Sequence, residues 1–357
     1  MEEKTLNYKP ANSNASTSCS NIKSSVKRIL IIRPGAIGDL IVTLPTIGAI
    51  RSHFKSAKIE VMGYPLYLEI IRGHFYADTV SRFDQADVAQ LFTKDAKMFT
   101  ALMKRLGDMD LIISFVSDKE RIFTNNLKTA GARHVVHYEP FPSDREGIHI
   151  IDYFLKFLNS LGISHLSKIP KLYLHDEDER FGDDFIKNRI TDPKKMLIAV
   201  HPGSGSRQKC WHTERFAILM NWLIKERDAQ VLVVSGPADG EIVSRLKMEV
   251  KIEADLIVLD QISLPNLAAV IKRCKFFIGN DSGIAHLAAA AGTPTVSIFG
   301  PTDPNMWGTR GEQVKILYNK IPCSPCSLET RKNCAAQICL ESIKVEDVVR
   351  EVRNISK

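Results

Sequence analysis

Short apolar runs alternate with helix-length segments along nearly the whole chain. The expected strands are residues 28–33, 58–63, 79–83, 110–116 and 133–137, then 196–200, 230–235, 256–259, 275–279 and 295–299. The expected helices are residues 39–53, 65–73, 86–106, 120–130 and 148–162, then 213–227, 238–251, 264–273 and 282–291. Repeated strand–helix units of this length are typical of parallel sheets covered by helices on both faces. We therefore predict an α/β protein with two doubly wound, Rossmann-like domains.

Composition changes along the chain indicate where these domains begin and end. The first residues are rich in Ser, Asn and Lys and lack an apolar core, which predicts a disordered tail and no secretory signal. A charged stretch from Asp176 to Arg189 is expected to be helical, and an amphipathic helix covers 345–352. The predicted parts are a tail (1–27), a first domain (28–165), a connection (166–195), a second domain (196–340) and a C-terminal helix (341–357).

Overall charge and hydropathy exclude several classes of protein. The hydrophobic fraction of 44% and charged fraction of 25% are those of a soluble globular protein. The net charge is +7, but no basic stripe interleaved with aromatic residues is present, so we expect no nucleic-acid partner. No apolar run approaches the ~20 residues of a membrane span. We expect a cytoplasmic protein, and a basic face around Lys119, Arg121, Lys128 and Arg133 would suit a phosphorylated glycolipid at the membrane surface.

The stretch from Phe277 to Ala290 combines a buried strand, a polar turn and an alanine-rich helix. The free N–H groups and the dipole at a helix start favour an anion, and Ser282 and Gly283 stand at this start. Asp281 would repel an anion, so we expect it to accept hydrogen bonds from hydroxyl groups. A phosphate beside a hydroxyl-rich group describes a nucleotide sugar.

Two further loops follow expected strands and have the same phosphate-binding character. The first is Pro34–Asp39, and the second is His201–Trp211, which carries Ser204, Gly205 and Lys209. Small residues permit close backbone approach to a ligand, and a lysine supplies positive charge for a diphosphate. Because ligands of parallel sheets bind beyond the carboxyl ends of the strands, the three loops predict one shared site.

These segments resemble glycosyltransferase family 9, the ADP-heptose:lipopolysaccharide heptosyltransferases. The motifs that carry the resemblance are Gly38-Asp39 with Thr43-Leu44-Pro45, His201-Pro202-Gly203 with Lys209 and Trp211, Asp281-Ser282-Gly283 with His286, and Gly292–Val296 continuing into Phe299–Pro304. The order and spacing fit over residues 28–355. One departure is His212, which stands where the family usually has proline.

The resemblance implies a GT-B architecture, with the acceptor bound by the first domain and the nucleotide sugar by the second. In that architecture the C-terminal helix can return to pack on the first domain. The implied reaction is inverting transfer of heptose from ADP-heptose to the inner core of lipopolysaccharide (a lipid A-Kdo acceptor), at the inner face of the cytoplasmic membrane. No cofactor or metal is required by this scheme.

The same resemblance assigns expected roles to individual residues. Asp39 is the candidate catalytic base, and Lys209 the clamp on the leaving diphosphate. The candidate donor-binding residues are Ser204, Gly205, Lys209, Asp281, Ser282, Gly283 and His286. Secondary candidates are Gly38, Thr43, His201, Thr302 and Asp303. The structural alternatives are helix N-caps for Asp39 and Asp281, a solvated loop lysine, buried packing histidines and turn-forming roles for Thr302 and Asp303.

Two other functions remain open on the same scaffold. A nucleotide-sugar epimerase or hydrolase would release free nucleotide without an acceptor. A non-catalytic nucleotide-sugar-binding protein would bind the donor and never turn it over. A dehydrogenase is disfavoured because Gly203-Ser204-Gly205 is followed by Gln208 instead of the third glycine of that fingerprint.

Four of the seven cysteines cluster near the C-terminus, at Cys323, Cys326, Cys334 and Cys339. Cys-x2-Cys is a spacing found among metal ligands, and four thiolates suit tetrahedral zinc. The second pair is loosely spaced, however, and a chain without an export signal is expected to keep its thiols reduced. Structural zinc and a loop of reduced thiols are therefore the two alternatives.

Overall fold

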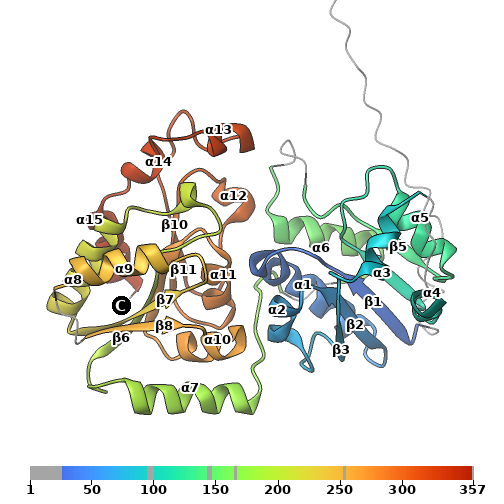
Figure 1. Ribbon diagram of the computed structural model, residues 1–357, viewed down its shortest axis with the longest axis horizontal. Helices are drawn as coiled ribbons and strands as arrows, with labels where there is room; N and C mark the ends of the chain where they lie inside the picture. The colour runs from blue at the N-terminus through green and yellow to red at the C-terminus, as the bar shows by residue number, and fades with distance from the viewer. Residues whose placement is uncertain (1–25, 95–99, 143–146, 165–166, 252–254, 356–357) are drawn as a thin grey trace, which may run out of the picture.

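The computed structural model describes residues 26–94, 100–142, 147–164, 167–251 and 255–355, which form two α/β bodies lying side by side (Figure 1). The predicted tail lies outside the described residues, except for its last two positions. Val26 is buried in the core, and the Lys27 backbone N–H donates to Asp110 Oδ2 at 2.8 Å. These two residues therefore belong to the first body.

The first body is built on a five-stranded parallel sheet in the order β3-β2-β1-β4-β5. Its strands are β1 (Arg28–Ile32), β2 (Lys58–Gly63), β3 (Thr79–Arg82), β4 (Leu111–Ser114) and β5 (Val135–His137). Its helices are α1 (Ile37–His53), α2 (Pro65–Leu68), α3 (Ala86–Ala89), α4 (Thr100–Gly107), α5 (Ile122–Thr129) and α6 (Ile150–Ser160), with 3-10 turns at Glu69–Ile71 and Gln90–Phe92.

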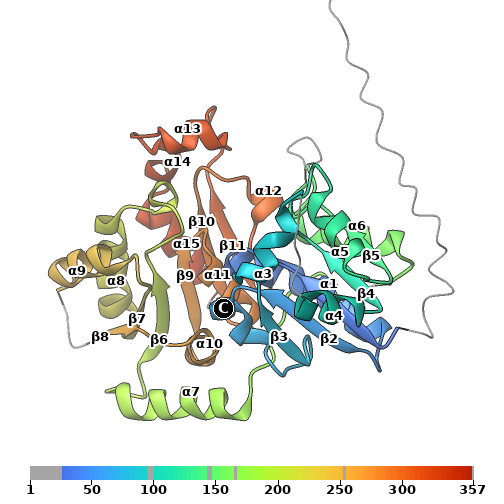
Figure 2. The same cartoon turned by 45° about the vertical axis from the view of Figure 1, so that its right-hand side comes forward.

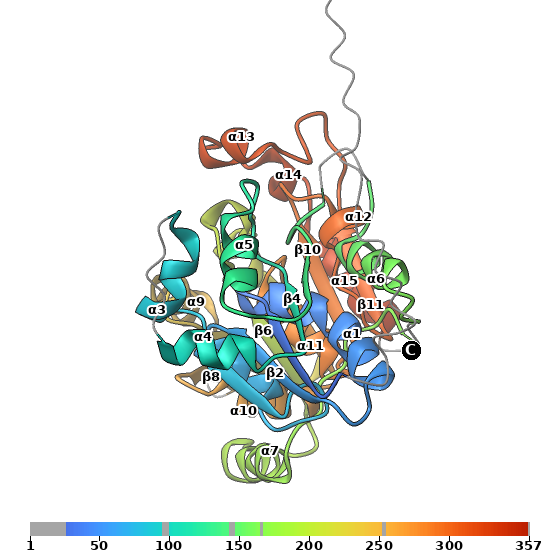
Figure 3. The ribbon, with the colours of Figure 1, turned by 90° about the vertical axis from the view of Figure 1, so that its right-hand side faces the viewer.

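Both faces of this sheet are buried, as its apolar strands require. Ile29 and Ile31 of β1 pack in the core formed with α1 and α6, whereas Leu30 and Ile32 face the core formed with α3, α4 and α5. Figure 3 shows these two helix layers on opposite sides of the strands. Because successive side chains of a strand point to opposite faces, a continuous apolar run is what a doubly covered strand needs.

The second body is built on a six-stranded parallel sheet in the order β11-β10-β9-β6-β7-β8. Its strands are β6 (Met196–His201), β7 (Ala229–Ser235), β8 (Leu256–Asp260), β9 (Phe276–Asn280), β10 (Thr295–Phe299) and β11 (Val314–Tyr318). Its helices are α7 (Asp176–Arg189), α8 (Thr213–Arg227), α9 (Gly240–Glu249), α10 (Leu264–Lys272), α11 (Gly283–Ala290), α12 (Pro304–Trp307), α13 (Leu328–Lys332), α14 (Ile338–Glu341) and α15 (Val345–Ile355).

The C-terminal helix does not return to the first body, so that expectation was wrong. Val348 and Val352 of α15 are buried in the core of the second body together with Phe216 of α8. The backbone just before α15 is fixed there too, because Trp211 Nε1 donates to the Ile343 carbonyl at 2.9 Å. An amphipathic helix packs on the nearest apolar surface of matching shape, and α8 supplies it.

Other elements depart from the sequence expectation. The single helix expected at 86–106 is broken, because the chain becomes extended at Thr93 after a short 3-10 turn; residues 95–99 lie outside the described residues. The short elements α12, α13 and α14 and the edge strand β11 were not predicted. The three short helices have too few residues to show a helical period, and Lys315 interrupts the apolar run of β11.

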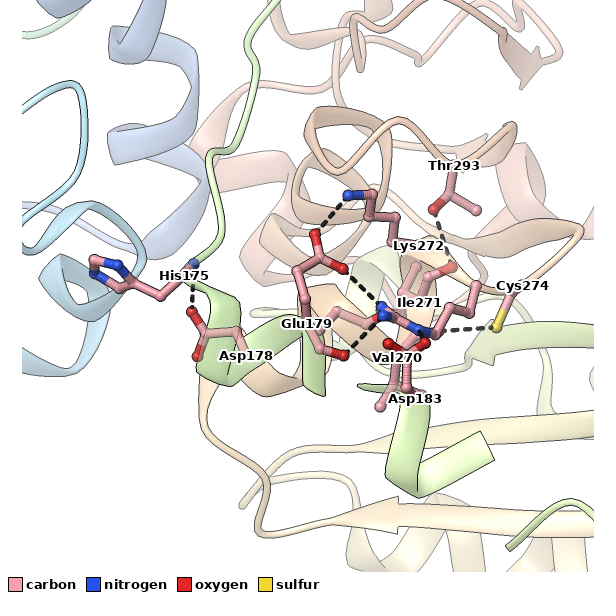
Figure 4. Close-up of polar contacts among 11 residues, drawn as sticks. His175, Asp178, Glu179, Asp183, Val270, Ile271, Lys272, Cys274 and Thr293 are labelled. Carbon is pink, nitrogen blue, oxygen red and sulfur yellow. Dashed lines mark hydrogen bonds and ion pairs between the residues drawn. The ribbon is translucent and has the colours of Figure 1, made fainter. Parts of the chain in front are cut away.

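Helix α7 attaches the middle of the predicted connection to the second body (Figure 4). Glu179 accepts from Lys272 Nζ at 2.6 Å and from Arg273 Nη1 at 2.9 Å, and Asp183 accepts from Arg273 Nε at 2.7 Å. Gly182 allows this approach, because a Cβ there would lie 2.6 Å from Arg273 Nη1. The charged stretch is therefore helical, as predicted, and is held on α10.

The two bodies share one continuous apolar core, because α1 of the first packs against α11 of the second. Figure 2 shows these two helices at the seam. Polar contacts cross the same seam: His149 Nε2 donates to the Gly308 carbonyl at 2.8 Å, and Asp152 accepts from Arg310 Nη2 at 2.6 Å. The seam is thus held by apolar packing, by one buried hydrogen bond and by one partly buried ion pair.

His149 should make this seam sensitive to acid. Its Nδ1 accepts the Ile151 N–H, so the ring must be neutral there, and burial lowers the pKa of His149 to about 4. Stability is therefore expected to fall as pH decreases from about 6.5 to about 4, by roughly 2–3 kcal/mol. Thermal unfolding of the wild type and His149→Asn should be compared across this range. Asn can still accept the Ile151 N–H but does not titrate, so an identical pH dependence in both proteins would contradict the assignment.

Candidate active site

A cleft of about 1050 Å³ opens between the carboxyl ends of the two sheets. The first body contributes the start of α1, Tyr67 and Phe141 to its walls. The second body contributes the loops that follow β6, β7, β9 and β10, and the start of α13. The three loops that sequence analysis singled out therefore meet in one cavity, as their positions after strands predicted.

The cleft floor is formed by the starts of α1 and α11, which touch backbone to backbone. A Cβ placed on Gly283 would lie 2.2 Å from Ile37 Cγ2 and 2.9 Å from the backbone N of Gly38. Only glycine fits at position 283 without moving one helix away from the other. Both helix N-termini, with their free N–H groups and positive dipole ends, converge near this floor.

Asp39 lies in the first turn of α1 and lines the cleft with 23% of its side chain exposed. Its Oδ2 accepts the Ala36 N–H at 2.8 Å, and its Oδ1 lies 3.5 Å from Arg33 Nη2. Gly35 has φ +138°, and a Cβ there would lie 2.7 Å from Asp39 Oδ2. The carboxylate is therefore oriented by its own loop, with one oxygen facing a buried guanidinium.

Arg33, the neighbour of Asp39, was missed by sequence analysis, which treated it as the last residue of a strand. Its Nε donates to Thr43 Oγ1 at 2.9 Å, and its guanidinium lies over the Phe154 ring at 5.2 Å. Burial lowers the pKa of Arg33 to about 10, and the charge of Asp39 opposes that shift. The cation stays protonated at neutral pH and supplies a fixed positive charge beside Asp39.

Thr43, expected among the secondary site residues, does not line the cleft. It is fully buried, and its hydroxyl donates to the Asp39 carbonyl at 2.7 Å while accepting from Arg33. Its contact with the site is therefore indirect: it fixes the arginine that faces the candidate base.

Lys209 and Asp281 form an ion pair in the cleft wall. Lys209 Nζ lies 2.7 Å from Asp281 Oδ2, with the two side chains 22% and 6% exposed. The Thr302 hydroxyl donates to the same carboxylate oxygen. The sequence predicts that Asp281 meets sugar hydroxyls and that Lys209 meets phosphate, whereas in the structure each is partnered by the other.

His201, Ser282 and Asp239 form a buried polar chain beside the start of α11. His201 Nδ1 lies 3.2 Å from Ser282 Oγ, and its Nε2 lies 3.2 Å from Asp239 Oδ2. Ser282 is also the N-cap of α11, since its Oγ accepts the Ala285 N–H at 3.3 Å. Asp239 follows β7 and was not among the predicted residues, because nothing in its local sequence distinguishes it.

His286 lines the cleft one turn into α11 and is 7% exposed. Within the described part of the chain its Nδ1 has no hydrogen-bond partner. Burial lowers the pKa of His286, with Asp281 and Asp39 opposing and Lys209 reinforcing the shift. A neutral imidazole with an unpartnered ring nitrogen is thus positioned between the two helix starts.

The remaining predicted residues also line the cleft. Ser204 donates its hydroxyl to the Asp281 carbonyl at 2.7 Å, and Gly205 has open space where a Cβ would stand. Asp303 caps α12, since its Oδ1 accepts the Asn305 N–H at 2.8 Å. These two loops therefore combine structural hydrogen bonds with exposure to the cavity.

Several cleft residues carried no signal in the sequence. Phe141 of the first body meets Trp307 of the second edge to face, with ring centroids 5.7 Å apart. Arg331 of α13 adds a cation to the same cavity. Their place in the site depends on how the two bodies face each other, which local sequence does not encode.

The C-terminal cysteines are not arranged as a metal site in the described residues. No group of three or more His, Cys, Asp or Glu side chains there could hold a metal ion. Cys326 Sγ lies 3.0 Å from the Cys323 carbonyl, and Cys339 is buried in the second core. Structural zinc at Cys323, Cys326, Cys334 and Cys339 stays a prediction. About one equivalent of zinc in anaerobically purified protein would support it, and none would leave reduced thiols.

The comparisons with known proteins agree with this architecture. The family model for glycosyltransferase family 9 (heptosyltransferase) matches residues 138–336, more than half of the chain. Lipooligosaccharide heptosyltransferase 2 of Campylobacter jejuni is 26% identical over 347 residues, which cover 92% of this chain and 98% of that protein.

Two solved structures share the fold over nearly their whole length. The glycosyltransferase family 9 protein of Veillonella parvula matches with a TM-score of 0.76 and 20% identity, covering 92% of this chain and 97% of that one. Escherichia coli ADP-heptose lps heptosyltransferase II matches with a TM-score of 0.71 and 17% identity, covering 92% and 98%. Across the ranges that the structure covers, no helix is both long and apolar enough to cross a membrane. The chain therefore belongs to glycosyltransferase family 9 and is a glycosyltransferase with the GT-B architecture.

Proposed function

We propose that this enzyme transfers heptose from ADP-heptose to the inner core of lipopolysaccharide, with inversion at the anomeric carbon. The observation that carries the proposal is the division of the cleft. A carboxylate on the wall of the first body faces a helix N-terminus, a lysine and a buried histidine on the wall of the second. The named relatives, a lipooligosaccharide heptosyltransferase and an ADP-heptose lps heptosyltransferase, support heptose and a lipopolysaccharide acceptor.

In the proposed reaction, Asp39 removes the proton from an acceptor hydroxyl as its oxygen attacks the anomeric carbon. The bond from that carbon to the β-phosphate oxygen breaks, and the nucleoside diphosphate leaves with the electron pair. Lys209 and the N–H groups at the start of α11 stabilise the growing negative charge. Gly205, Thr302 and Asp303 lie where the donor's phosphates and sugar would be held. The first body takes the acceptor, at the inner face of the cytoplasmic membrane.

The proposal is tested with ADP-heptose and a lipid A-Kdo acceptor. Mass spectrometry should show the acceptor gaining one heptose, with one ADP released per transfer. Release of ADP at full rate without acceptor would favour an epimerase or hydrolase. Binding of ADP-heptose without turnover in the presence of acceptor would favour a non-catalytic binding protein. Lipopolysaccharide from cells lacking the protein should be shorter by one heptose.

Lys209→Ala is expected to weaken ADP binding and slow transfer, by about 2–4 kcal/mol in total if the contact tightens in the transition state. The same change also leaves the Asp281 carboxylate without its lysine. Calorimetry with ADP reports the ground-state part, and steady-state kinetics report the whole effect.

Lys195→Ala is a matched control for this prediction. Lys195 and Asp255 form an ion pair of 2.8 Å with similar exposure, 23% and 10%, and neither residue lines the cleft. Lys195→Ala should lower the free energy of unfolding about as much as Lys209→Ala does, while ADP affinity stays at the wild-type value. Equal ADP affinities in the two variants would show that Lys209 has only a structural role.

A further inference from the structure

Asp239, His201 and Ser282 form a chain of hydrogen bonds in which the position of each proton can be worked out. His201 ends β6, whereas Asp239 and Ser282 follow β7 and β9; each of the three is less than 8% exposed and lines the cleft. Both ring nitrogens of His201 are partnered, at 3.2 Å to Asp239 and 3.2 Å to Ser282. The direction of each bond is fixed by what its partner can do.

Asp239 determines which ring nitrogen carries hydrogen. Burial alone would raise the pKa of Asp239, but its hydrogen bond with His201, attraction to a positive charge on His201 and the Gly236 N–H together lower it. The carboxylate is therefore ionised and can only accept, so Nε2 of His201 must carry a proton. In the neutral imidazole, Nδ1 is then bare, and the Ser282 hydroxyl must donate to it.

With this arrangement, Ser282 has no hydroxyl proton left to donate to an anion. Its oxygen accepts the Ala285 N–H, and its hydroxyl proton is committed to His201. Toward the cleft, the Ser282 side chain therefore offers only a lone pair, beside the backbone N–H groups at the start of α11. A phosphate oxygen placed there would be repelled by the Ser282 oxygen, because both atoms present lone pairs. The helix N-terminus around it nevertheless attracts anions. One added proton on Nδ1 reverses the bond and frees the Ser282 hydroxyl.

We propose that binding of a nucleoside diphosphate at the start of α11 is linked to protonation of His201, which redirects the Ser282 hydroxyl from the imidazole to the phosphate. The inference rests on the proposed function, because it takes that ligand to be the leaving group of the donor. The imidazolium would lie between the Asp239 carboxylate and the incoming negative charge, so both neighbours stabilise it.

Except for Arg207, a cation that opposes an imidazolium, the other ionisable groups around the chain favour the same linkage. Lys209 is neutralised by Asp281 within the same wall, so its repulsion of an imidazolium is reduced. Burial raises the pKa of Cys210 to about 11, which leaves that thiol neutral, and burial keeps His286 neutral as well. Arg207 on the same loop is a further cation. The incoming diphosphate is therefore the unbalanced charge that draws a proton to His201.

The test is calorimetric titration of the full-length protein with ADP at about pH 7.5, in buffers of low and high ionisation enthalpy. The dependence of the observed enthalpy on the buffer gives the number of protons taken up. Wild type is expected to take up more protons than His201→Asn, by as much as about one. The ionisation of ADP itself is common to both proteins and cancels in this difference. His149→Asn, the same substitution at a histidine outside the chain, should match wild type.

Two further variants separate the parts of the chain. Asp239→Asn keeps an acceptor for Nε2 but removes the charge, so proton uptake should fall, and this holds even if His201→Asn does not fold. Ser282→Ala should reduce the extra uptake to the part that comes from direct charge attraction; full uptake without the hydroxyl would overturn the relay. ADP binding with equal uptake in wild type and His201→Asn would overturn this inference alone. Absence of ADP binding to wild type would overturn the proposed function with it.

Discussion

Asp39→Asn should reduce the transfer rate by about 10²–10⁴-fold, the usual loss when a general base is removed. The amide oxygen of Asn can still accept the Ala36 N–H that orients the side chain. Geometry is therefore retained, and only the ability to take the acceptor's proton is lost. Steady-state assays with ADP-heptose and acceptor measure the effect on rate.

Donor binding provides the internal control for Asp39→Asn. Asp39 belongs to the first body, whereas Lys209 and the start of α11 belong to the second, so ADP affinity should change little. Loss of ADP affinity in parallel with rate would mean that the substitution disturbed the cleft as a whole. Turnover near the wild-type value would remove Asp39 from the mechanism.

Gly283→Ala should cause a comparably large loss of transfer. The added methyl would lie 2.2 Å from Ile37 Cγ2 and 2.9 Å from the Gly38 backbone N, so α1 and α11 must separate. Asp39 follows Gly38 directly, and the separation therefore increases the distance between the base and the donor site. A misplacement of about 1 Å can cost about 10²-fold in rate. The free energy of unfolding should also fall, by about 1–3 kcal/mol, because the seam is overpacked.

Gly240→Ala is the matched control for this substitution. Gly240 is also the first residue of its helix, α9, and nothing lies within 4 Å of the position that a Cβ would occupy. Alanine there should be neutral or slightly stabilising, with unchanged kinetics. Wild-type activity in Gly283→Ala would show that the two bodies tolerate a wider seam.

Much of the fold could be predicted because its signals are local. Continuous apolar strands and the helices between them identified two parallel sheets, and α8 (Thr213–Arg227) was predicted with its observed bounds. The three loops were recognised by small and polar residues directly after strands. The rule that ligands bind at the carboxyl ends of parallel strands then predicted that they would meet.

The remainder depends on contacts between distant segments. In the sequence, Arg33 directly follows an apolar strand and was assigned to it. Its buried position beside Asp39 arises only from the turn between the two residues. The pairing of Lys209 with Asp281 joins the loops after two different strands. The place of α15 depends on which apolar surface of the folded protein it can pack against, and this surface is α8. An amphipathic pattern shows that a helix will be covered on one face, but it does not identify the partner.

The first sheet uses residues up to His137 and the second begins at Met196. Because α15 stays with the second body, the described part of the chain crosses the seam only once. On the ribosome, the first body can therefore complete its sheet before any strand of the second has emerged. The start of α1, with Ile37 and Gly38, then faces water until α11 is synthesised and Gly283 can dock against it. The surface that later becomes the floor of the active site thus stays uncovered in the nascent chain until most of the second body has been synthesised.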